Sequence, residues 1–381
     1  MVDQGSSSDR HADADDDFEW AERSEYWRTY EPKRAGQKQK YRYRQPLVLC
    51  GHGVKISVDH NTLLIREGFT HYPQTSETIR LFPGDANLPD RIIMLDGSGG
   101  ISFDALDWMS DQRVGLVKLD WRGEISSMGG GAQFSANPKL VELQQKAKLS
   151  KKRTEIARWL IGEKIIASTK TLREIIPSSI NRENAISRLE KRTSEIRNSK
   201  KSISISRLLG IEGDCAAAYF RAWHGVPLNW SGIKRKPVPN NWLEIVPRNM
   251  LWQRHAQNAR HPINAMLNYG YGILKGQLLI EAVAAGLDPS IGFVHGNYSN
   301  RIPLILDLME PLRPVVDSNI LRFALSHMFT PGDFTINRTG GCRLNPQLAK
   351  QIVKQTAISA GVSLVLKGAL ARICSVTIRF Q

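Results

Sequence analysis

The first third of the chain alternates short apolar runs with turn-forming residues. Between residues 46 and 137, these runs are rich in Val, Ile and Leu and are separated by Gly, Pro, Asn and Asp. Such runs predict β-strands, and the polar residues 59–61 predict a hairpin turn between two of them. The expected strands cover residues 47–49, 54–58, 63–65, 78–82, 91–95 and 114–120. The pattern predicts a small antiparallel β domain.

Helical periodicity begins with one short segment and then continues through the rest of the chain. Ser102 is an N-cap candidate, and Phe103, Leu106 and Met109 follow at spacings of three, which predicts an amphipathic helix inside the β domain. Asn137 is a second N-cap candidate, and the proline after it suits a first helical turn. The 244 residues after Asn137 are expected to be nearly all helical.

The predicted fold class is therefore α+β, with a small N-terminal antiparallel β domain at 46–136 and a larger all-α domain at 137–381. Residues 1–45 precede both domains as an acidic-then-basic extension. Its first 20 residues hold seven Asp or Glu and one Arg, so they are expected to be disordered and do not resemble a signal peptide. Residues 21–45 interleave cations with aromatic side chains, which either stack on nucleic-acid bases or dock on the protein surface. We favour docking.

Composition limits the class of protein further. No apolar run approaches the ~20 residues that a membrane span needs, so no membrane segment is expected. The four cysteines form no CxxC pair, which predicts reduced thiols in a cytoplasmic protein. The formal net charge of +15 favours a phosphate-rich partner such as nucleic acid.

The strongest local charge excess lies at residues 139–207, which hold 18 Lys or Arg against 7 Asp or Glu. The pattern predicts two helices joined near Ile176 and Pro177. A charged run of this kind is usually a solvated face, but the size of the excess makes it a candidate DNA-facing surface.

The segments that carry candidate chemistry lie in the helical part. Because the chain has no Walker A loop, GxGxxG, HExxH or GxSxG, the usual signatures of nucleotide hydrolysis, hydride transfer, zinc proteolysis and serine hydrolysis are missing. Three segments instead combine an acid or a histidine with apolar neighbours. They are LGIEGD at 209–214, GFVHGN at 292–297 and DLMEPLRP at 307–314.

Each of these residues has an ordinary structural explanation when it is taken alone. Glu212 suits the first turn of a helix, His295 a hydrogen-bonded loop, and Glu310 a helix end before proline. Together with Asp307 they form a set of carboxylates and one imidazole without a thiolate. Such a set suits Mg²⁺ or Mn²⁺ better than it suits zinc. On a basic protein such a site indicates phosphodiester chemistry. Spacing alone does not show that these residues converge.

Ordered segments along the chain resemble one known family. They are GHG at 51–53, GISFDAL at 100–106, LGIEG at 209–213, HPINAMLNYGY at 261–271, GLDPSIGFVH at 286–295 and DLMEPLRP at 307–314. The chain resembles the CRISPR-associated integrase-endonucleases that insert new spacers, known as the universal CRISPR adaptation endonuclease family. The resemblance extends from about residue 46 to the end of the chain.

The resemblance implies a small β domain followed by a helical catalytic domain, and a homodimer joined largely through the β domains. The family's metal ligands fall on Glu212, His295 and Glu310, which would hold Mn²⁺ or Mg²⁺. The implied activity is metal-dependent cutting and joining of double-stranded DNA, in which a 3′-hydroxyl attacks a phosphodiester at a repeat boundary. A small ferredoxin-like adaptation partner would complete a hetero-oligomer that carries the duplex.

Four further residues are candidates for supporting roles. Asp307 is expected in the outer shell of the metal or as an alternative acid. Asn264 either positions the site or belongs to a purely structural helix. Arg301 and Arg313 either contact phosphate or form ion pairs with Asp307 or Glu310.

Two other functions stay open. The first is a related transposon-type integrase, which we would expect to carry a further DNA-binding module; the short stretch after Ala371 argues against it. The second is a metal-free nucleic-acid-binding scaffold, and the intact Glu212, His295 and Glu310 argue against that. The chain also departs from the family at His261, where an acid is common, and in its extension of residues 1–45.

Overall fold

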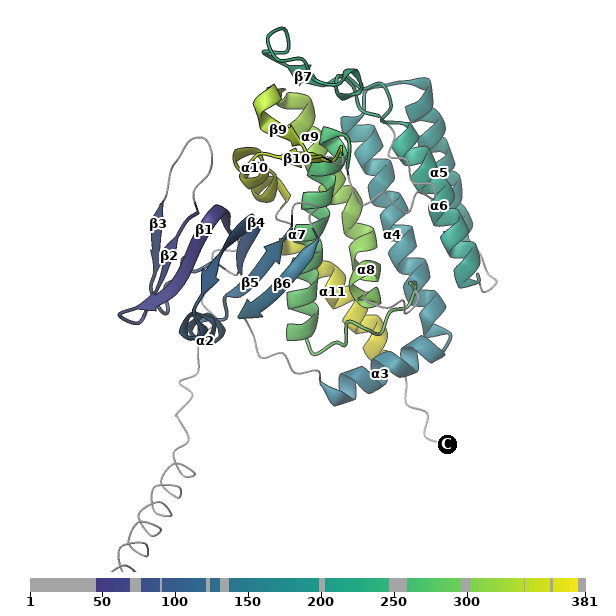
Figure 1. The fold of residues 1–381 in the computed structure, drawn as a ribbon. Helices are drawn as coiled ribbons and strands as arrows, with labels where there is room; N and C mark the ends of the chain where they lie inside the picture. The colour runs from purple at the N-terminus through teal and green to yellow at the C-terminus, as the bar shows by residue number, and fades with distance from the viewer. Residues whose placement is uncertain are drawn as a thin grey trace, which may run out of the picture. The chain divides into compact units, whose positions relative to one another are not determined.

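The N-terminal part of the described chain is one six-stranded sheet with the order β3-β2-β1-β4-β5-β6 (Figure 1). The strands are β1 (Leu47–Asp59), β2 (Thr62–Arg66), β3 (Thr78–Leu81), β4 (Arg91–Ile101), β5 (Gly115–Leu119) and β6 (Ile125–Gly130). The computed structural model describes residues 46–68, 77–89, 91–120, 124–130, 137–198, 203–246, 259–295, 302–338, 340–356 and 359–375. The predictions for residues 1–45 lie outside these ranges.

The sheet is mixed, so the expectation of a purely antiparallel sheet is wrong. β1 pairs antiparallel with β2, and β5 with β6, but β4 runs parallel to both of its neighbours, β1 and β5. Parallel pairing needs a crossover connection, which α2 (Phe103–Asp111) supplies between β4 and β5. The predicted hairpin is confirmed: His60 and Asn61 both have positive φ in the turn between β1 and β2.

Helix α2 covers one face of the sheet. Ser102 caps it as predicted, accepting a hydrogen bond from the backbone N–H of Ala105. The buried side chains are Ala105, Trp108 and Met109, whereas Phe103 is 85% exposed. The predicted face was therefore wrong at its first position, because spacings of three drift around a helix with 3.6 residues per turn.

The opposite face of the sheet packs against helices. Alternate positions of the central strands point to different cores, so Leu49 and Ile92 face α2 whereas Val48 and Ile93 join the core of the helical part. Residues of β5 contact α7 (Pro262–Ala284), and residues of β1 contact α10 (Pro346–Thr356).

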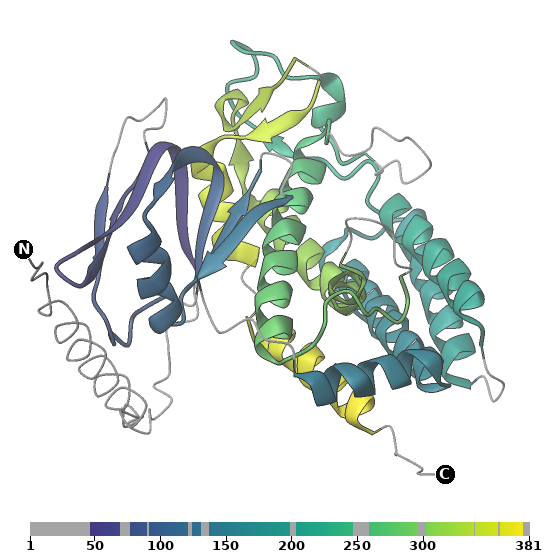
Figure 2. The same ribbon diagram turned by 60° about the horizontal axis from the view of Figure 1, so that its bottom comes forward.

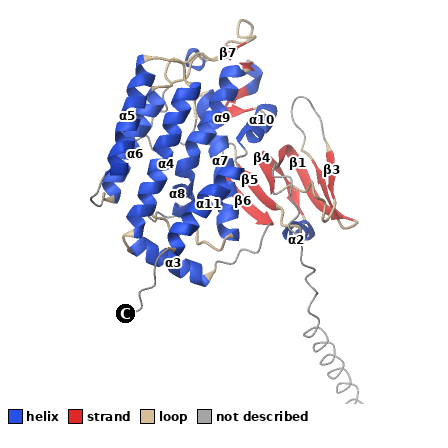
Figure 3. Cartoon of the chain, turned by 180° about the vertical axis from the view of Figure 1, so that it is seen from behind, coloured by secondary structure: helices blue, strands red, loops and turns tan. Residues whose placement is uncertain are grey.

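The rest of the described chain is mainly helical, as predicted (Figure 3). The other helices are α3 (Pro138–Leu149), α4 (Lys152–Ile175), α5 (Ile180–Asn198), α6 (Ile205–Arg221), α8 (Pro303–Met309), α9 (Arg313–Ser326) and α11 (Ser359–Cys374), with the 3-10 turns η1 (Asn240–Trp242), η2 (Glu310–Leu312) and η3 (Pro331–Asp333). Four short strands interrupt them: β7 (Asn229–Trp230), β8 (Met328–Phe329), β9 (Phe334–Ile336) and β10 (Cys342–Leu344).

The predicted helix boundaries are right in two places and incomplete in a third. Asn137 accepts hydrogen bonds from the N–H groups of the first turn of α3, and the break near Ile176 separates α4 from α5. A further break at Ser150 was not predicted, so the basic segment 139–207 forms more than two helices.

Helix α4 connects segments that are distant in sequence. It contacts α3, α5, α6, α9 and η2, and Figure 2 shows it among these elements. Side chains from α6 and from the α8–η2 junction can therefore meet on its inner face. Within the described ranges, no single helix is long and apolar enough to cross a membrane, although the bent pair Pro346–Thr356 and Gly361–Cys374 meets those criteria jointly.

Candidate active site

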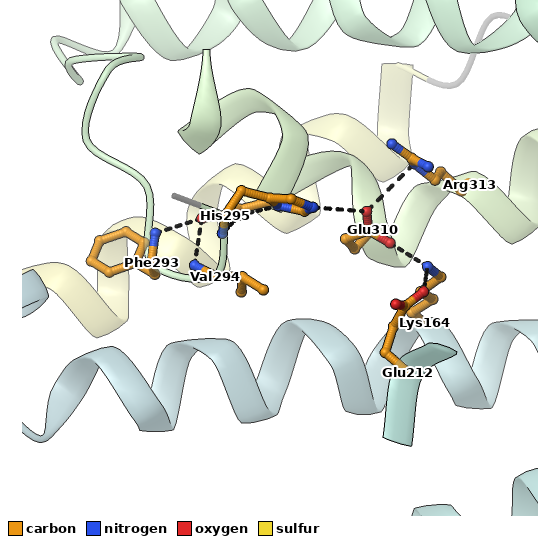
Figure 4. A network of polar contacts seen from close by, with 8 residues as sticks. Lys164, Glu212, Phe293, Val294, His295, Glu310 and Arg313 are labelled. Atoms are coloured by element: carbon orange, nitrogen blue, oxygen red, sulfur yellow. Dashed lines mark hydrogen bonds and ion pairs between the residues drawn. The ribbon is translucent and has the colours of Figure 1, made fainter. Parts of the chain in front are cut away.

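Two of the predicted carboxylates meet at one cation. Glu212 lies in the middle of α6, and Glu310 lies where α8 passes into η2. Lys164, from the centre of α4, donates one hydrogen bond to Glu212 Oε1 and another to Glu310 Oε2, the second at 2.5 Å (Figure 4). Packing of α4 against both α6 and η2 therefore brings together acids that the sequence separates.

His295 is oriented by Asp307. The Asp307 side chain is fully buried and accepts hydrogen bonds from the backbone N–H groups of Phe293, Val294 and His295. Asp307 Oδ1 also forms a hydrogen bond with Nδ1 of the His295 ring, at a distance of 2.7 Å. Both Asp307 oxygens are thus occupied, and the other ring nitrogen, Nε2, lies 4.0 Å from Glu310 Oε1.

The loop that carries His295 is tied down on both sides. A Cβ at Gly292 would lie 2.7 Å from Pro303 Cβ and 3.0 Å from Asp307 Oδ2, so only glycine allows this close approach. Gln144 of α3 donates a hydrogen bond to the carbonyl of Ile291 at 2.8 Å, and Arg153 of α4 donates one to the carbonyl of Phe293 at 2.9 Å. The loop that leads to His295 is therefore held by α3, by α4 and, through Asp307, by α8.

Arg313 and Lys164 approach different oxygens of Glu310, Oε1 and Oε2 respectively (Figure 4). Arg313 Nε is 3.6 Å from Glu310 Oε1, and its guanidinium lies 5.4 Å from the centre of the Tyr271 ring. The Tyr271 hydroxyl donates to Asp317 at 2.5 Å. Of the two alternatives for Arg313, the structure therefore contains the ion pair with Glu310.

Asn264, Arg301 and His261 were also singled out from the sequence, and the structure describes two of them. Asn264 is half-buried in the first turn of α7, and in the described ranges no hydrogen bond joins it to Glu212, His295 or Glu310. Arg301 lies outside the described ranges. His261, where the chain departs from the family pattern, caps α7 by accepting from the N–H of Ile263.

The electrostatics of the site favour the ionised form of Glu310. Burial alone would raise the pKa of Glu310, but Arg313, Lys164 and His295 outweigh it and bring the pKa to about 2. The hydrogen bond to Asp307 raises the pKa of His295 above its ordinary value, against the opposing effect of burial. Glu310 is consequently a carboxylate across the physiological pH range.

The donor set fits an oxygen-preferring divalent ion. Two carboxylates already converge on a positive charge, an imidazole lies beside one of them, and no thiolate is present in the cluster. As the described side chains stand, no three His, Cys, Asp or Glu residues are close enough together to hold an ion. Lys164 Nζ occupies the space between the two acids, so metal binding there requires the ammonium to move.

Lys164 was missed by sequence reasoning. It lies among 18 cations at residues 139–207, and the charge count does not distinguish it. A usable signal was its helical position: Leu160 and Ser168, four residues before and after it, are both buried. A lysine on the same stripe of a helix as two buried residues faces inward.

The fold and this site define a class of proteins in which a β region precedes a helical region with clustered acids and a histidine. A casposase bound to its integration product shares the fold, with a TM-score of 0.69 at 24% identity over 88% of this chain and 92% of that one. A chain of a Cas6-RT-Cas1–Cas2 complex gives a TM-score of 0.58 at 16% identity over 89% of this chain and 37% of that one.

The chain belongs to the CRISPR associated protein Cas1 family, whose model matches residues 47–357. A protein of Methanospirillum hungatei is 33% identical over 150 residues, which are 39% of this chain and 40% of that protein. One of Pyrobaculum aerophilum is 26% identical over 272 residues, or 69% of this chain and 82% of the relative. Both are named CRISPR-associated endonuclease Cas1 1. The predicted family is confirmed.

Proposed function

We propose that this protein is a metal-dependent endonuclease and integrase that inserts short duplex DNA into a CRISPR array. Family membership and the names of the curated relatives support the reaction class. The observation that carries the proposal is the convergence of Glu212 and Glu310 on one cation, with His295 held beside them. A basic protein with net charge +15 suits a polyanionic substrate.

The proposed roles follow from the contacts. Glu212, His295 through Nε2, and Glu310 hold Mg²⁺ or Mn²⁺, which when bound neutralises phosphate charge and lowers the pKa of the attacking hydroxyl. Asp307 is a positioning residue, because it fixes the His295 ring through Nδ1 and leaves Nε2 free to bind. Arg313 stabilises the ionised form of Glu310 through Oε1, the oxygen that Lys164 does not contact.

The reaction exchanges one phosphate ester for another. The 3′-hydroxyl of the incoming duplex loses its proton to solvent, and its oxygen forms a new bond to phosphorus. The bond from phosphorus to the 3′-oxygen of the target strand breaks, and this oxygen takes up a proton. The number of ester bonds is unchanged, so no external energy source is required.

The proposed assembly is a cytoplasmic homodimer that works on double-stranded DNA with a small ferredoxin-like adaptation partner. A similar chain fold in a Cas1–Cas2 complex supports the partner. In the proposed assembly each chain has a β domain at 46–136 and a helical catalytic domain at 137–381. Asn264 and Arg301 stay proposed DNA or second-shell contacts.

A strand-transfer assay tests the proposed function. We expect Glu212→Ala, His295→Ala and Glu310→Ala each to abolish joining of a 3′-hydroxyl duplex to a repeat-containing target, and EDTA to do the same to the wild type. Strand transfer at the wild-type rate in Mn²⁺ by any of these variants would refute its role as a ligand. Salt-sensitive DNA binding with no product under any condition would favour the scaffold. Joining only of transposon ends would favour the transposon-type integrase.

A further inference from the structure

We infer that Lys164 is an internal counter-ion, which holds the two carboxylates in the metal-free protein and is displaced when the divalent ion binds. This inference rests on the proposed metal site and assigns a role to a residue outside the predicted ligand set. It concerns the order of events at the site: the metal replaces an ammonium group that is already in place.

The first support is the position of Lys164. Its side chain is 14% exposed, against 23% for Glu212 and 6% for Glu310, so the three charges are largely removed from water. The lysine extends from the middle of a 24-residue helix whose neighbouring inward positions are buried. The helix therefore directs the Lys164 ammonium group towards the two carboxylates.

The second support is charge balance. Two carboxylates that face the same point repel each other, and leaving them without a cation in a buried site is strongly unfavourable. Among the described residues, only Lys164 donates hydrogen bonds to both acids. Arg313 lies near the other oxygen of Glu310, Oε1, and within the described part of the chain no hydrogen bond or ion pair joins it to Glu212. Lys164 thus keeps the acids together before metal arrives.

The third support is competition for the same space. A divalent ion held by both Glu212 and Glu310 would lie close to both carboxylates, where Lys164 Nζ now lies, since hard cations bind carboxylate oxygen directly. The two cations exclude each other at short range, so metal binding must include the departure of the ammonium. The apparent dissociation constant for the metal is then the intrinsic constant divided by the fraction of molecules in which Lys164 is already displaced.

Measurement of Mn²⁺ affinity tests this on the full-length chain. We compare wild type with Lys164→Met, using the electron paramagnetic resonance signal of free Mn²⁺ to quantify binding. If the displaced conformer makes up about one tenth of the wild type, the dissociation constant of the variant is expected to fall about tenfold. Lys170→Met is the matched control, because Lys170 lies on the same helix, is 73% exposed, and pairs with Glu174.

The outcomes separate this inference from the proposed function. If Glu212→Gln does not change Mn²⁺ binding by the protein, the proposed metal site itself is refuted. Wild type that does bind Mn²⁺ at this site, with affinity unchanged or weakened by Lys164→Met, would overturn the counter-ion role alone. A merely structural lysine predicts such a weakening, because its loss would disorder the ligands.

A second measurement needs no variant and covers the case in which Lys164→Met does not fold. Wild-type protein is acetylated briefly with an N-hydroxysuccinimide ester, with EDTA or with Mn²⁺, and the peptide that contains Lys164 is quantified by mass spectrometry. We expect labelling of Lys164 to rise severalfold with Mn²⁺ while labelling of Lys170 stays constant. Equal labelling of Lys164 in both conditions would contradict its displacement.

Discussion

Helix α6 takes part in two ion networks that differ in burial. Glu212 points to the buried cation of Lys164, whereas Asp214, two residues on, accepts from Arg188 at 2.8 Å and from Arg192 at 3.0 Å. Glu212 and Asp214 are similarly exposed, at 23% and 27%. Their partners differ, because Lys164 is 14% and Glu310 6% exposed, whereas Arg188 is 53% exposed. Both networks look alike as lists of charges, and their surroundings set them apart.

The difference in burial between the two networks indicates which charged groups are candidates for a functional role. Exposed ion pairs contribute about 0–1 kcal/mol and are common on helical surfaces. Buried acids lose hydration and persist only where a cation or hydrogen bonds compensate for it. The inner network is therefore the better candidate for metal chemistry, and the outer network serves mainly to join α5 to α6.

The same distinction bears on the predicted DNA-facing surface at residues 139–207. Many of its cations are already paired with acids. The pairs include Lys146–Glu142, Lys152–Glu155, Arg173–Glu190, Arg182–Glu183 and Arg207–Glu195. A DNA-facing role for residues 139–207 stays a prediction. The net charge of this segment overstates how many of its Lys and Arg side chains are available to contact phosphate.

The comparison predicts its largest effect in catalysis. Glu212→Gln removes a proposed ligand and is expected to slow strand transfer at least about 1000-fold, which corresponds to roughly 4 kcal/mol of transition-state stabilisation. Asp214→Asn on the same helix should change the rate less than about threefold. Single-turnover rates in Mn²⁺ check both variants. Equal losses in the two would mean that pairing with the buried Lys164 and Glu310 does not distinguish Glu212 from Asp214.

Stability in the absence of metal gives the next largest difference. In EDTA, Lys164→Met leaves two buried carboxylates without their shared cation and is expected to lower the free energy of unfolding by about 3–5 kcal/mol. Arg192→Met, in the exposed network, should lower it by less than about 1 kcal/mol. Urea denaturation followed by circular dichroism measures both. A loss for Lys164→Met no larger than that for Arg192→Met would refute the difference.

The pH dependence of stability isolates Glu310. Its pKa of about 2 lies below the ordinary value of 4.5, so ionised Glu310 stabilises the folded state above pH 4.5. That contribution, on the order of 3 kcal/mol, is lost as pH falls from 4.5 through 2. The difference in unfolding free energy between wild type and Glu310→Gln, measured in EDTA, should therefore shrink over this interval. Parallel curves would contradict the depressed pKa.

Asp307 should give the smallest effect on the inner side. Asp307→Asn keeps the size of the side chain but weakens the hydrogen bond at His295 Nδ1, so strand transfer is expected to fall about 10- to 100-fold. The apparent Mn²⁺ affinity should fall with it. A variant with unchanged affinity and rate would show that Asp307 only closes the loop around Gly292.

The sequence predicted the local features of the fold best. The turn at His60 and Asn61 and the caps at Ser102 and Asn137 depend on a few adjacent residues, and each is confirmed. The parallel pairing of β4 was not predicted, because it depends on partners far along the chain. Strand β6 was missed because its sequence, ISSMGG, lacks a strand-like apolar pattern.

The candidate site divides in the same way. Unusual residue types in apolar segments drew attention to Glu212, His295 and Glu310, and the family resemblance assigned them a role. Their arrangement depends on α4 packing, which no local pattern encodes, so the lysine 48 positions before Glu212 and 146 before Glu310 was not predicted. Asp307 was expected as an outer acid, and its four hydrogen bonds explain how it could act there.

The most direct test is to locate manganese in crystals of the protein. Crystals grown in EDTA and then soaked in Mn²⁺ would be measured at a wavelength where manganese scatters anomalously. The account predicts one strong peak in each chain that contacts Glu212, His295 Nε2 and Glu310, with Lys164 Nζ moved away from the two acids. No peak there, or a peak elsewhere while Lys164 still bridges the carboxylates, would contradict it.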